Sequence, residues 1–506
     1  MKLKRSLYLA HRWLGVAMCL FFLMWFVSGI VMMYVAFPSL TSQERLAGLP
    51  NLDAQTVLVD PYPLINGVGA ANVESLRLTT LVTRPAYLLK TKDGKFQSIF
   101  ADTGEKTPAV TAEHALLQAQ SFYRNTNAKT MSAAATAPSV RASIAQQNLI
   151  IDQWSVSSSL NPHRPLHKIA LNDTAGTQLY VSTASGEVVR DTTQHERLWN
   201  WLGANLHWIY PFQLRQHVSV WHWLVVVLSF LGMLSVLTGG TVGLMRMRLR
   251  QRYRGRDITP YTGVKKIHHL LGLTCFLFFL TYITSGFLSM NPLGIFNSNA
   301  SCQINERMYS GNLPENSTAL RRDNIQQLVK NNSHLKEIRF HWVTDQVYPI
   351  GITESTETNF TQHLLEDHGQ PLQAIAEHAV TTASAQCNKN TKIIKTTVLN
   401  AFDNYYYSHH GSDRPLPAYK IELSDDEKTW VYINASTGDW IFSKTFKQRI
   451  QRWLYNGLHS LDFLFLIERR PLWDLIVISL CLLGIVMAFS SAAIAFKRVR
   501  LKRSLN

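Results

Sequence analysis

Four long apolar runs constrain this chain more than any other feature. They cover residues 13–37, 218–245, 270–296 and 472–496 and carry almost no charged side chains. About 20 apolar residues suffice to cross the hydrocarbon core of a bilayer, so each run is long enough to span it. The first run follows several basic residues, as a signal peptide would, but a signal core has only about 7–15 apolar residues. We therefore expect four retained transmembrane helices.

The positive charge of the chain is confined to short segments beside these runs. The formal net charge is +16. The basic residues lie before the first run, between the second and third, and after the fourth: Lys2, Lys4, Arg5, Arg12; Arg246, Arg248, Arg250, Arg252, Arg254, Arg256, Lys265, Lys266; Lys497, Arg498, Arg500, Lys502 and Arg503. Such short basic segments stay in the cytoplasm. We expect a multi-pass inner-membrane protein with both termini cytoplasmic, and no face for nucleic acid.

This topology divides the chain into alternating membrane and soluble parts. The expected units are 1–37, the N-terminus and first helix; 38–217, a first periplasmic domain with an interfacial segment; 218–245, the second helix; 246–267, a basic cytoplasmic loop; 268–296, the third helix; 297–471, a second periplasmic domain with an interfacial segment; and 472–506, the fourth helix and a basic tail. Cys302 and Cys387 lie in the second external segment, where an oxidising compartment would permit a disulfide. The sequence leaves that pairing open.

The external segments have an α+β pattern. Residues 111–124 have helical character, whereas 167–173 and 177–191 alternate apolar and polar residues with glycine at the turns. Residues 419–442 repeat the alternation. This pattern predicts half-buried antiparallel sheets in both segments.

The chain matches itself at two nearly equal offsets. HRWLG at 11–15 matches HHLLG at 268–272, and the Ser-Gly pair at 28–29 matches that at 285–286, both at an offset of 257. Ten residues between 165 and 232 match residues between 417 and 484 at an offset of 252. These matches predict two tandem, parallel repeats related by an axis along the membrane normal. Their four helices should form a small bundle.

Four histidines recur within this repeat. His11 and His268 lie at the inner ends of the first and third runs, and His207 and His459 lie just outside the second and fourth. Haem iron takes two axial ligands, and imidazole is a common one. Two pairs at opposite faces predict two b-type haems, ligated through these four side chains. The absence of a C-x-x-C-H motif argues against covalent haem attachment in this chain.

Glycines follow two of these histidines at helical spacing. Gly15 and Gly29 lie one and five turns after His11, and Gly272 and Gly286 take the same places after His268. Glycine lets a flat macrocycle approach the backbone, so these positions are candidate cofactor contacts. The alternative is close helix packing between small residues.

Other histidines are alternates for the same role. His222, near the outer end of the second run, could replace His207, or it could pair with Asp474, its counterpart in the repeat, or with a haem propionate. An ionisable group at membrane depth is costly and often functional. His269 and His217 are weaker alternates for the inner and outer sites.

These residues give the chain a resemblance to the PepSY-associated transmembrane family. The matching motifs are H-R-W-L-G…S-G, H-H-L-L-G…S-G, the Leu-His pairs at 206–207 and 458–459, and the strand-turn patterns LYVSTASGEVV and VYINASTGDWI. The resemblance covers nearly the whole chain, with 38–110 and 297–370 the least matched parts. It implies a PepSY-like periplasmic domain in each repeat. It also implies similarity to inner-membrane ferric-siderophore reductases that hold two b-type haems.

The same resemblance implies partners. The acceptor would be a periplasmic ferric siderophore or other ferric chelate, released as iron(II). Some relatives carry a cytoplasmic flavodoxin or reductase domain, which this chain has no room for, so the donor would be a quinol or a separate flavoprotein. A candidate docking surface within 402–415 contains Tyr406, His409, His410 and Arg414. Its alternative interpretation is an ordinary hairpin loop.

Two other functions remain open from the sequence alone. A permease for iron or a chelate would fit the repeats and the four helices, but the spans lack the broken helices and buried charges of transport sites. A non-catalytic anchor whose external domains bind a periplasmic partner would leave the inner histidines unexplained.

Overall fold

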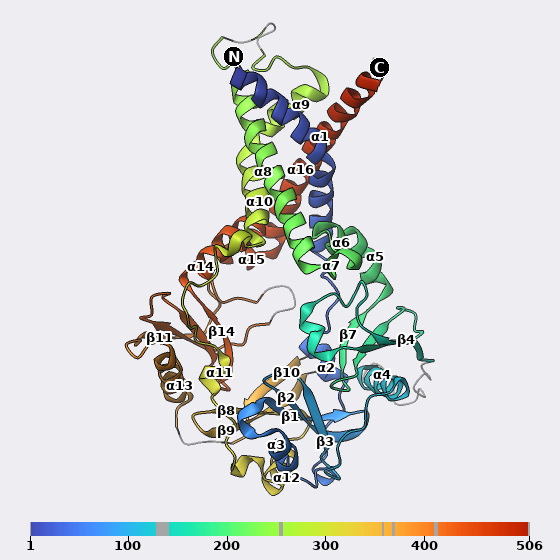
Figure 1. The fold of residues 1–506 in the computed structure, drawn as a ribbon, viewed down its shortest axis with the longest axis vertical. Coiled ribbons are helices and arrows are strands. Elements are labelled where there is room, and N and C mark those ends of the chain that lie inside the picture. Colours follow the sequence, from blue (N-terminus) through green and yellow to red (C-terminus); the bar gives the residue numbers. More distant parts are fainter. Residues whose placement is uncertain are drawn as a thin grey trace.

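The computed structural model describes residues 2–127, 141–251, 253, 257–356, 359–366, 370–408 and 413–503. Figure 1 shows two parts: a group of long helices that carries both chain termini at its far end, and a β-rich part at the other. The two ends of the helical part are termed the terminus side and the domain side below.

The helical part contains up to four membrane spans. Its helices are α1 (Lys2–Met32), α8 (Val218–Arg246), α16 (Arg470–Arg503) and a bent pair, α9 (Gly263–Thr274) and α10 (Phe276–Ser289). α1 packs against α8 and α16, while α10 packs against α8 and α9 against α16. Leu20, Leu277 and Leu475 remain at least 65% exposed on these helices. Apolar surface of this extent requires surrounding lipid, so the chain is a multi-pass membrane protein.

The third span differs from its prediction as one helix over 268–296, and it corrects the expectation that none of the spans is broken. It begins at Gly263, bends by 70° at residue 275 and ends at Ser289. The Thr274 hydroxyl donates to the carbonyls of Leu270 and Leu271 (3.1 and 3.2 Å), a bond that bends helices. Pro292 cannot continue the hydrogen-bonded ladder and instead begins a short 3₁₀ turn, η5 (Pro292–Gly294).

A six-stranded sheet lies farthest from the helices, in the order β10-β9-β8-β1-β2-β3. Its strands are β1 (Val73–Leu81), β2 (Arg84–Thr91), β3 (Phe96–Phe100), β8 (Leu335–Val343), β9 (Gln346–Thr356) and β10 (Asn359–Leu364). β1 pairs antiparallel with β8, where Leu76 faces Phe340, Arg77 faces Arg339 and Leu78 faces Ile338. The two external segments therefore share one sheet, whereas the sequence predicted a separate domain in each. The shared sheet comes from the segments that match the family motifs least.

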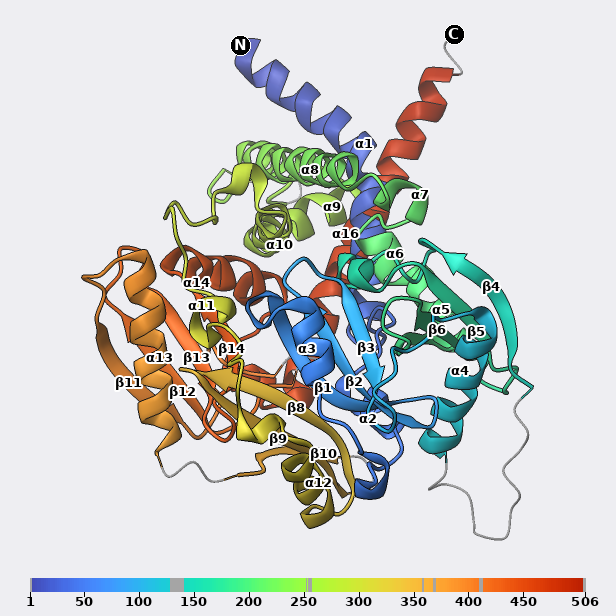
Figure 2. The same cartoon turned by 60° about the horizontal axis from the view of Figure 1, so that its bottom comes forward.

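Two four-stranded sheets flank the shared one, each with a helix on one face (Figure 2). The first lobe comprises α4 (Ala112–Asn127), β4 (Ser143–Leu149), β5 (Leu166–Ala170), β6 (Gln178–Ser182) and β7 (Val188–Thr192). The second comprises α13 (Leu372–Cys387), β11 (Ile393–Leu399), β12 (Ala418–Leu423), β13 (Trp430–Asn434) and β14 (Trp440–Lys444). The predicted helix and the alternating strands are confirmed here, because the apolar positions of each sheet pack beneath its helix.

Short elements complete the fold. They are α2 (Ser42–Ala47), α3 (Tyr62–Val68), α5 (Gln194–Leu202), α6 (Ala204–His207), α7 (Phe212–Arg215), α11 (Glu306–Ser310), α12 (Arg322–Asn331), α14 (Phe446–Arg452), α15 (Leu464–Ile467), the 3₁₀ turns η1 (Ala54–Thr56), η2 (Ala70–Asn72), η3 (Ser158–His163) and η6 (Thr318–Leu320), and a π-helical turn, η7 (Trp453–Gly457).

A buried charge network ties the first lobe to the shared sheet. Arg45 and Arg77 both contact the Glu337 carboxylate (2.8 and 3.2 Å), and Arg77 also contacts Glu187 of the lobe (2.5 Å). Burial alone would raise the pKa of Glu337, but the two guanidinium groups outweigh it and lower that pKa to about 2. The network therefore holds Glu337 ionised inside the protein.

A disulfide links the second lobe to the chain that enters it. Cys302 and Cys387 are bonded across 85 positions of sequence. This bond answers a question that the sequence left open, because cysteine spacing alone does not define pairing.

Candidate functional site

Two connectors between the sheets and the membrane helices place histidines at the domain side of these helices. α5 and α14 each begin with a capping box, formed by Thr193 with Glu196 and, 252 positions later, by Thr445 with Gln448. The first connector leads to His207 at the end of α6, and the second leads through the π-helical turn to His459. Each cap satisfies the free amides of the first helical turn and fixes where its connector starts.

The structure brings together the four sequence-predicted histidines as two pairs. The ring centres of His11 (α1) and His268 (α9) are 6.3 Å apart on the terminus side. Those of His207 and His459 are 6.1 Å apart on the domain side. Two imidazoles bound to opposite faces of one metal should have centres about 6 Å apart, from metal–nitrogen bonds of about 2.0 Å and about 1.1 Å from ring nitrogen to ring centre. Both separations fit one shared iron.

All four imidazoles use Nδ1 for a contact with the protein. Nδ1 of His207 lies 3.0 Å from Ser28 Oγ, and Nδ1 of His459 lies 3.1 Å from Ser285 Oγ, the equivalent serine 257 positions later. Each serine donates its own hydrogen to a helix carbonyl, so its oxygen accepts from the imidazole. The proton therefore lies on Nδ1 and the lone pair on Nε2.

Both histidines of the terminus-side pair also use Nδ1 for a contact with a protein oxygen. Nδ1 of His11 donates to the Ser235 carbonyl (3.2 Å), and Nδ1 of His268 contacts the hydroxyls of Ser490 and Ser491 (3.1 and 3.2 Å). Among the described residues, none hydrogen-bonds to Nε2 of any of the four histidines. Metal-binding histidines characteristically donate their other ring nitrogen to a nearby oxygen, which fixes the tautomer and the ring orientation. The donor set therefore fits axial ligation through Nε2.

The domain-side pair is neutral. Burial and, to a lesser extent, the neighbouring His459 lower the pKa of His207 to about 3. Burial also lowers the pKa of His459. Neutral imidazole is the form that binds a metal.

A cavity of about 400 Å³ surrounds the terminus-side pair. It lies within the range of about 300–1,000 Å³ that is usual for small-molecule and cofactor sites. Its wall contains both histidines and the predicted glycines Gly15 and Gly272. A Cβ on Gly15 would meet no atom within 4 Å, whereas one on Gly272 would lie 3.0 Å from Met487 Cε. Gly15 thus leaves open space at the cavity wall.

The other two predicted glycines lie against the domain-side histidines. A Cβ on Gly29 would be 3.8 Å from His207 Cε1, and one on Gly286 would be 3.5 Å from His459 Cε1. The two glycines lie 257 positions apart in the sequence, and each makes room for an imidazole. Glycine here serves the histidine ring directly.

Several site residues escaped the sequence analysis. The carbonyl and hydroxyl partners of Nδ1 were not predicted, although the duplicated Ser-Gly pairs marked two of them. Gly239 was also missed: a Cβ there would lie 2.7 Å from His11 Cε1. Its counterpart in the other half is Ser491, which contacts His268, so comparing the two halves position by position would have indicated it.

The alternate histidines do not join either pair. Both ring nitrogens of His269 already form hydrogen bonds, Nδ1 with Thr259 Oγ1 (2.7 Å) and Nε2 with the Gly243 carbonyl (2.9 Å). His269 thereby links the loop before α9 to α8. His222 packs edge-on against the neighbouring Trp223. Asp474 forms its ion pair with Arg470 one helical turn earlier, not with His222. His217 is exposed at the start of α8.

The proposed docking surface needs one correction. Tyr406 is fully buried, stacks on Tyr432 and donates its hydroxyl to the Pro415 carbonyl, so it belongs to the lobe core and offers no surface to a substrate. Arg414 lies over the Phe442 ring at 4.6 Å. His409 and His410 lie outside the described residues.

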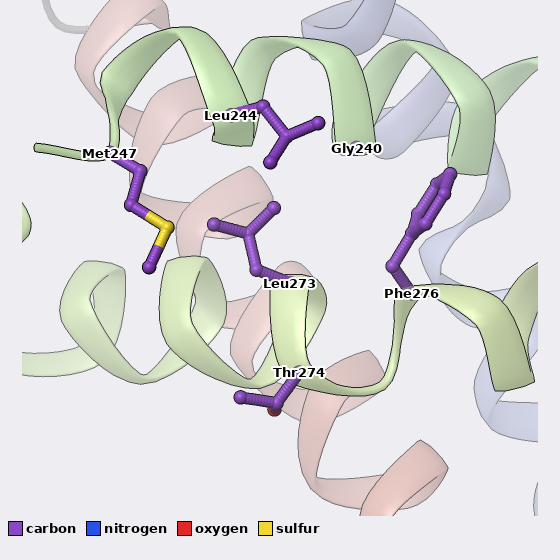
Figure 3. Close-up of a pocket in the computed structure, with 6 residues that line it drawn as sticks. All are labelled: Gly240, Leu244, Met247, Leu273, Thr274 and Phe276. Carbon is purple, nitrogen blue, oxygen red and sulfur yellow. The ribbon is translucent and has the colours of Figure 1, made fainter. Parts of the chain in front are cut away.

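A second hollow lies between α8 and the α9–α10 bend (Figure 3). Gly240 and Leu244 line it from α8, Met247 lines it directly after the end of α8, and Leu273, Thr274 and Phe276 line it from the bent pair. Its volume is about 220 Å³. None of the described residues in its wall is titratable, and the thioether of Met247 is the one side chain among them that could bind iron.

The described residues contain no group of three or more His, Cys, Asp or Glu side chains that could hold a metal ion alone. Two imidazoles suffice only when a macrocycle supplies the remaining ligands, as haem does. The site is thus suited to a metal that arrives within a cofactor.

These features define a class: a multi-pass membrane protein with β-sheet domains on one side and paired imidazoles at two levels of its helices. The family model for the PepSY-associated TM region matches residues 8–498, so the chain belongs to this family, as its motifs indicated. A comparison with curated proteins finds no match.

Proposed function

We propose that this protein is a transmembrane haem b oxidoreductase that passes electrons to a periplasmic ferric chelate, as a ferric-siderophore reductase does. The observation that carries the proposal is the state of the four imidazoles: each directs Nδ1 to a protein oxygen and leaves Nε2 without a hydrogen bond to any described residue, and the ring centre of its partner histidine lies about 6 Å away. His11 with His268 would hold one haem, and His207 with His459 a second. Bound haem supplies a reversible one-electron couple.

The two pairs are suited to opposite faces of a membrane. Gly29, which contacts His207, lies 18 positions after His11 on the continuous helix α1. At about 1.5 Å per residue this is about 27 Å, close to the thickness of a hydrocarbon core. The basic flanks of the spans favour a cytoplasmic terminus side and a periplasmic domain side in the inner membrane.

A tandem repeat supports shared ligation from two halves. The Ser28–His207 contact recurs as Ser285–His459, with the serine 257 and the histidine 252 positions later. Arg77 faces Arg339 where β1 meets β8, and each is the fifth residue of its nine-residue strand. These pairs are what a pseudo-twofold axis through the sheet and a four-helix bundle would produce. Each haem would then lie on that axis and take one ligand from each half.

The proposed acceptor and donor are those that the resemblance to ferric-siderophore reductases implies. Hard oxygen chelators bind iron(III) more tightly than iron(II), so adding one electron to the metal favours its release. The periplasmic sheets would present the chelate to the domain-side pair. A quinol or a cytoplasmic flavoprotein would supply electrons on the terminus side.

The test uses the full chain in nanodiscs, reduced with dithionite and freed of excess reductant. Adding a ferric hydroxamate should oxidise the haem, seen as loss of the reduced b-type absorption band. Each electron transferred should release one iron(II), which a chromogenic chelator traps. The paired substitution His207→Ala with His459→Ala should abolish this, whereas His217→Ala, at an exposed histidine, should not. A reduced band that ferric chelates leave unchanged would refute the reductase activity.

A further inference from the structure

The cavity around His11 and His268 has a charged mouth. Its interior is lined by glycine and apolar side chains, but on the terminus side Arg12, Lys265 and Arg498 also line it, together with Tyr8 and Tyr261. The three cations come from three different helices, α1, α9 and α16. No acidic residue occurs among the described residues that form its wall.

These three cations have no anionic partner in the described part of the chain. The nearby Lys266 pairs with Asp257 (2.8 Å), but Arg12, Lys265 and Arg498 form no ion pair there. Cations grouped at the edge of a low-dielectric cavity attract an anion strongly. Arginine is particularly suited to carboxylate and phosphate groups, because its planar fork donates two parallel hydrogen bonds.

The cations are close to the histidine pair along the chain. Lys265 lies three residues before His268, and Arg498 lies seven residues after Ser491, which contacts His268. A spacing of three residues puts Lys265 on the same helix face as His268. A spacing of seven residues, about two turns, puts Arg498 on the same face as Ser491. The same cavity therefore contains histidine nitrogens suited to a metal and, at its terminus-side end, cations suited to an anion.

We propose that Arg12, Lys265 and Arg498 bind the carboxylates of a flat, dianionic macrocycle, and so orient it with its acidic edge toward the terminus side. The inference rests on the proposed function, since the macrocycle would be haem and the carboxylates its propionates. An anionic lipid phosphate has the same binding chemistry. The experiment must separate these two sources.

The probe is iron-free protoporphyrin IX, compared with its uncharged dimethyl ester. Both are titrated by fluorescence into the full chain, stripped of haem, in phosphatidylcholine nanodiscs. The wild type should bind the acid at least tenfold more tightly than the ester. The triple variant Arg12→Gln, Lys265→Gln, Arg498→Gln should lose about this tenfold preference and bind the ester unchanged, as expected for a few solvent-accessible ion pairs.

A matched triple variant controls for net charge. Arg5→Gln, Lys266→Gln and Arg500→Gln remove the same charge from the same three helices, yet none of these residues lines the cavity. This variant should keep the acid-to-ester preference. An equal loss in both triple variants would overturn the proposal, because net charge would then be the cause.

Lipid binding is tested in the same variants. If, in nanodiscs that also contain phosphatidylglycerol, the cavity-lining triple variant binds the acid like wild type but retains less of that lipid, the cations serve lipid phosphate and the proposal fails. The iron-free probe also separates this inference from the proposed function. The double variant His11→Ala, His268→Ala should retain the acid-to-ester preference, although it would lose haem iron ligation.

Discussion

The hydroxyl groups of Ser28 and Ser285 should control how tightly the domain-side histidines hold haem. Ser28 is fully buried, accepts from His207 Nδ1 at 3.0 Å and donates to the Met24 carbonyl at 2.6 Å. Ser28→Ala removes the acceptor and leaves the buried imidazole N–H with only a weaker interaction with the Trp25 backbone. The ring would then be free to rotate away from the orientation that Nε2 needs.

The expected loss of haem affinity can be estimated from two independent principles. Removing an outer partner of a metal-binding histidine lowers metal affinity about 10–100-fold, which corresponds to about 1.4–2.8 kcal/mol. An unpaired buried donor costs about 1–3 kcal/mol, which agrees. Ser285→Ala should cost less than Ser28→Ala, because His459 Nδ1 keeps the Tyr282 carbonyl at 3.3 Å.

The assay is haem titration into the stripped, full-length variants, followed at the b-type band. Two binding phases are expected, one for each histidine pair. In Ser28→Ala the haem affinity of the phase from His207 and His459 should fall, and that of the phase from His11 and His268 should be unchanged. The control is Ser289→Ala, one turn beyond Ser285, whose hydroxyl contacts only a helix carbonyl. Wild-type affinity in Ser28→Ala and in the double serine variant would refute the assigned tautomer and the ligand role of the pair.

Three further results are expected. Gly239→Val should displace His11, since even a Cβ would lie 2.7 Å from the ring, and the purified variant should lose one haem and keep the other. Glu337→Gln should lower the free energy of unfolding of the β-rich part by about 3 kcal/mol in urea at pH 7, because its two arginines lose their shared anion. Because the folded pKa of Glu337 is lowered to about 2, its stabilisation should be complete above pH ~5 and decline as pH falls from about 4 toward 2. Burial and two nearby glutamates raise the pKa of Asp191 to about 7; stability should therefore fall as pH rises from about 4 to 7, and Asp191→Asn should flatten that slope.

The membrane spans and the histidine pairs could be predicted because their signals are local or repeated. Apolar length identifies a span without tertiary information. The duplicated positions of His207 and His459 indicated a pair before any distance was known. The second span was placed almost to the residue, at 218–245 against 218–246 in the structure.

The shared sheet could not be predicted in the same way. Pairing of Leu76 with Phe340 joins residues far apart in the chain, and neither strand pattern identifies its neighbour. The bend at residue 275 depends on how the Thr274 hydroxyl is used, which helix periodicity does not reveal. Tyr406 was misplaced because a tyrosine in a polar loop can equally be core, and here it stacks on Tyr432.

Haem content of the purified full chain tests the central claim most directly. Wild type should contain two b-type haems per chain, and each paired substitution, His11→Ala with His268→Ala or His207→Ala with His459→Ala, should leave one. The variant that lacks all four imidazoles should contain none, while His269→Ala should retain both. A colourless wild type, or a fourfold variant that still shows the b-type band on reduction, would contradict ligation by these four histidines.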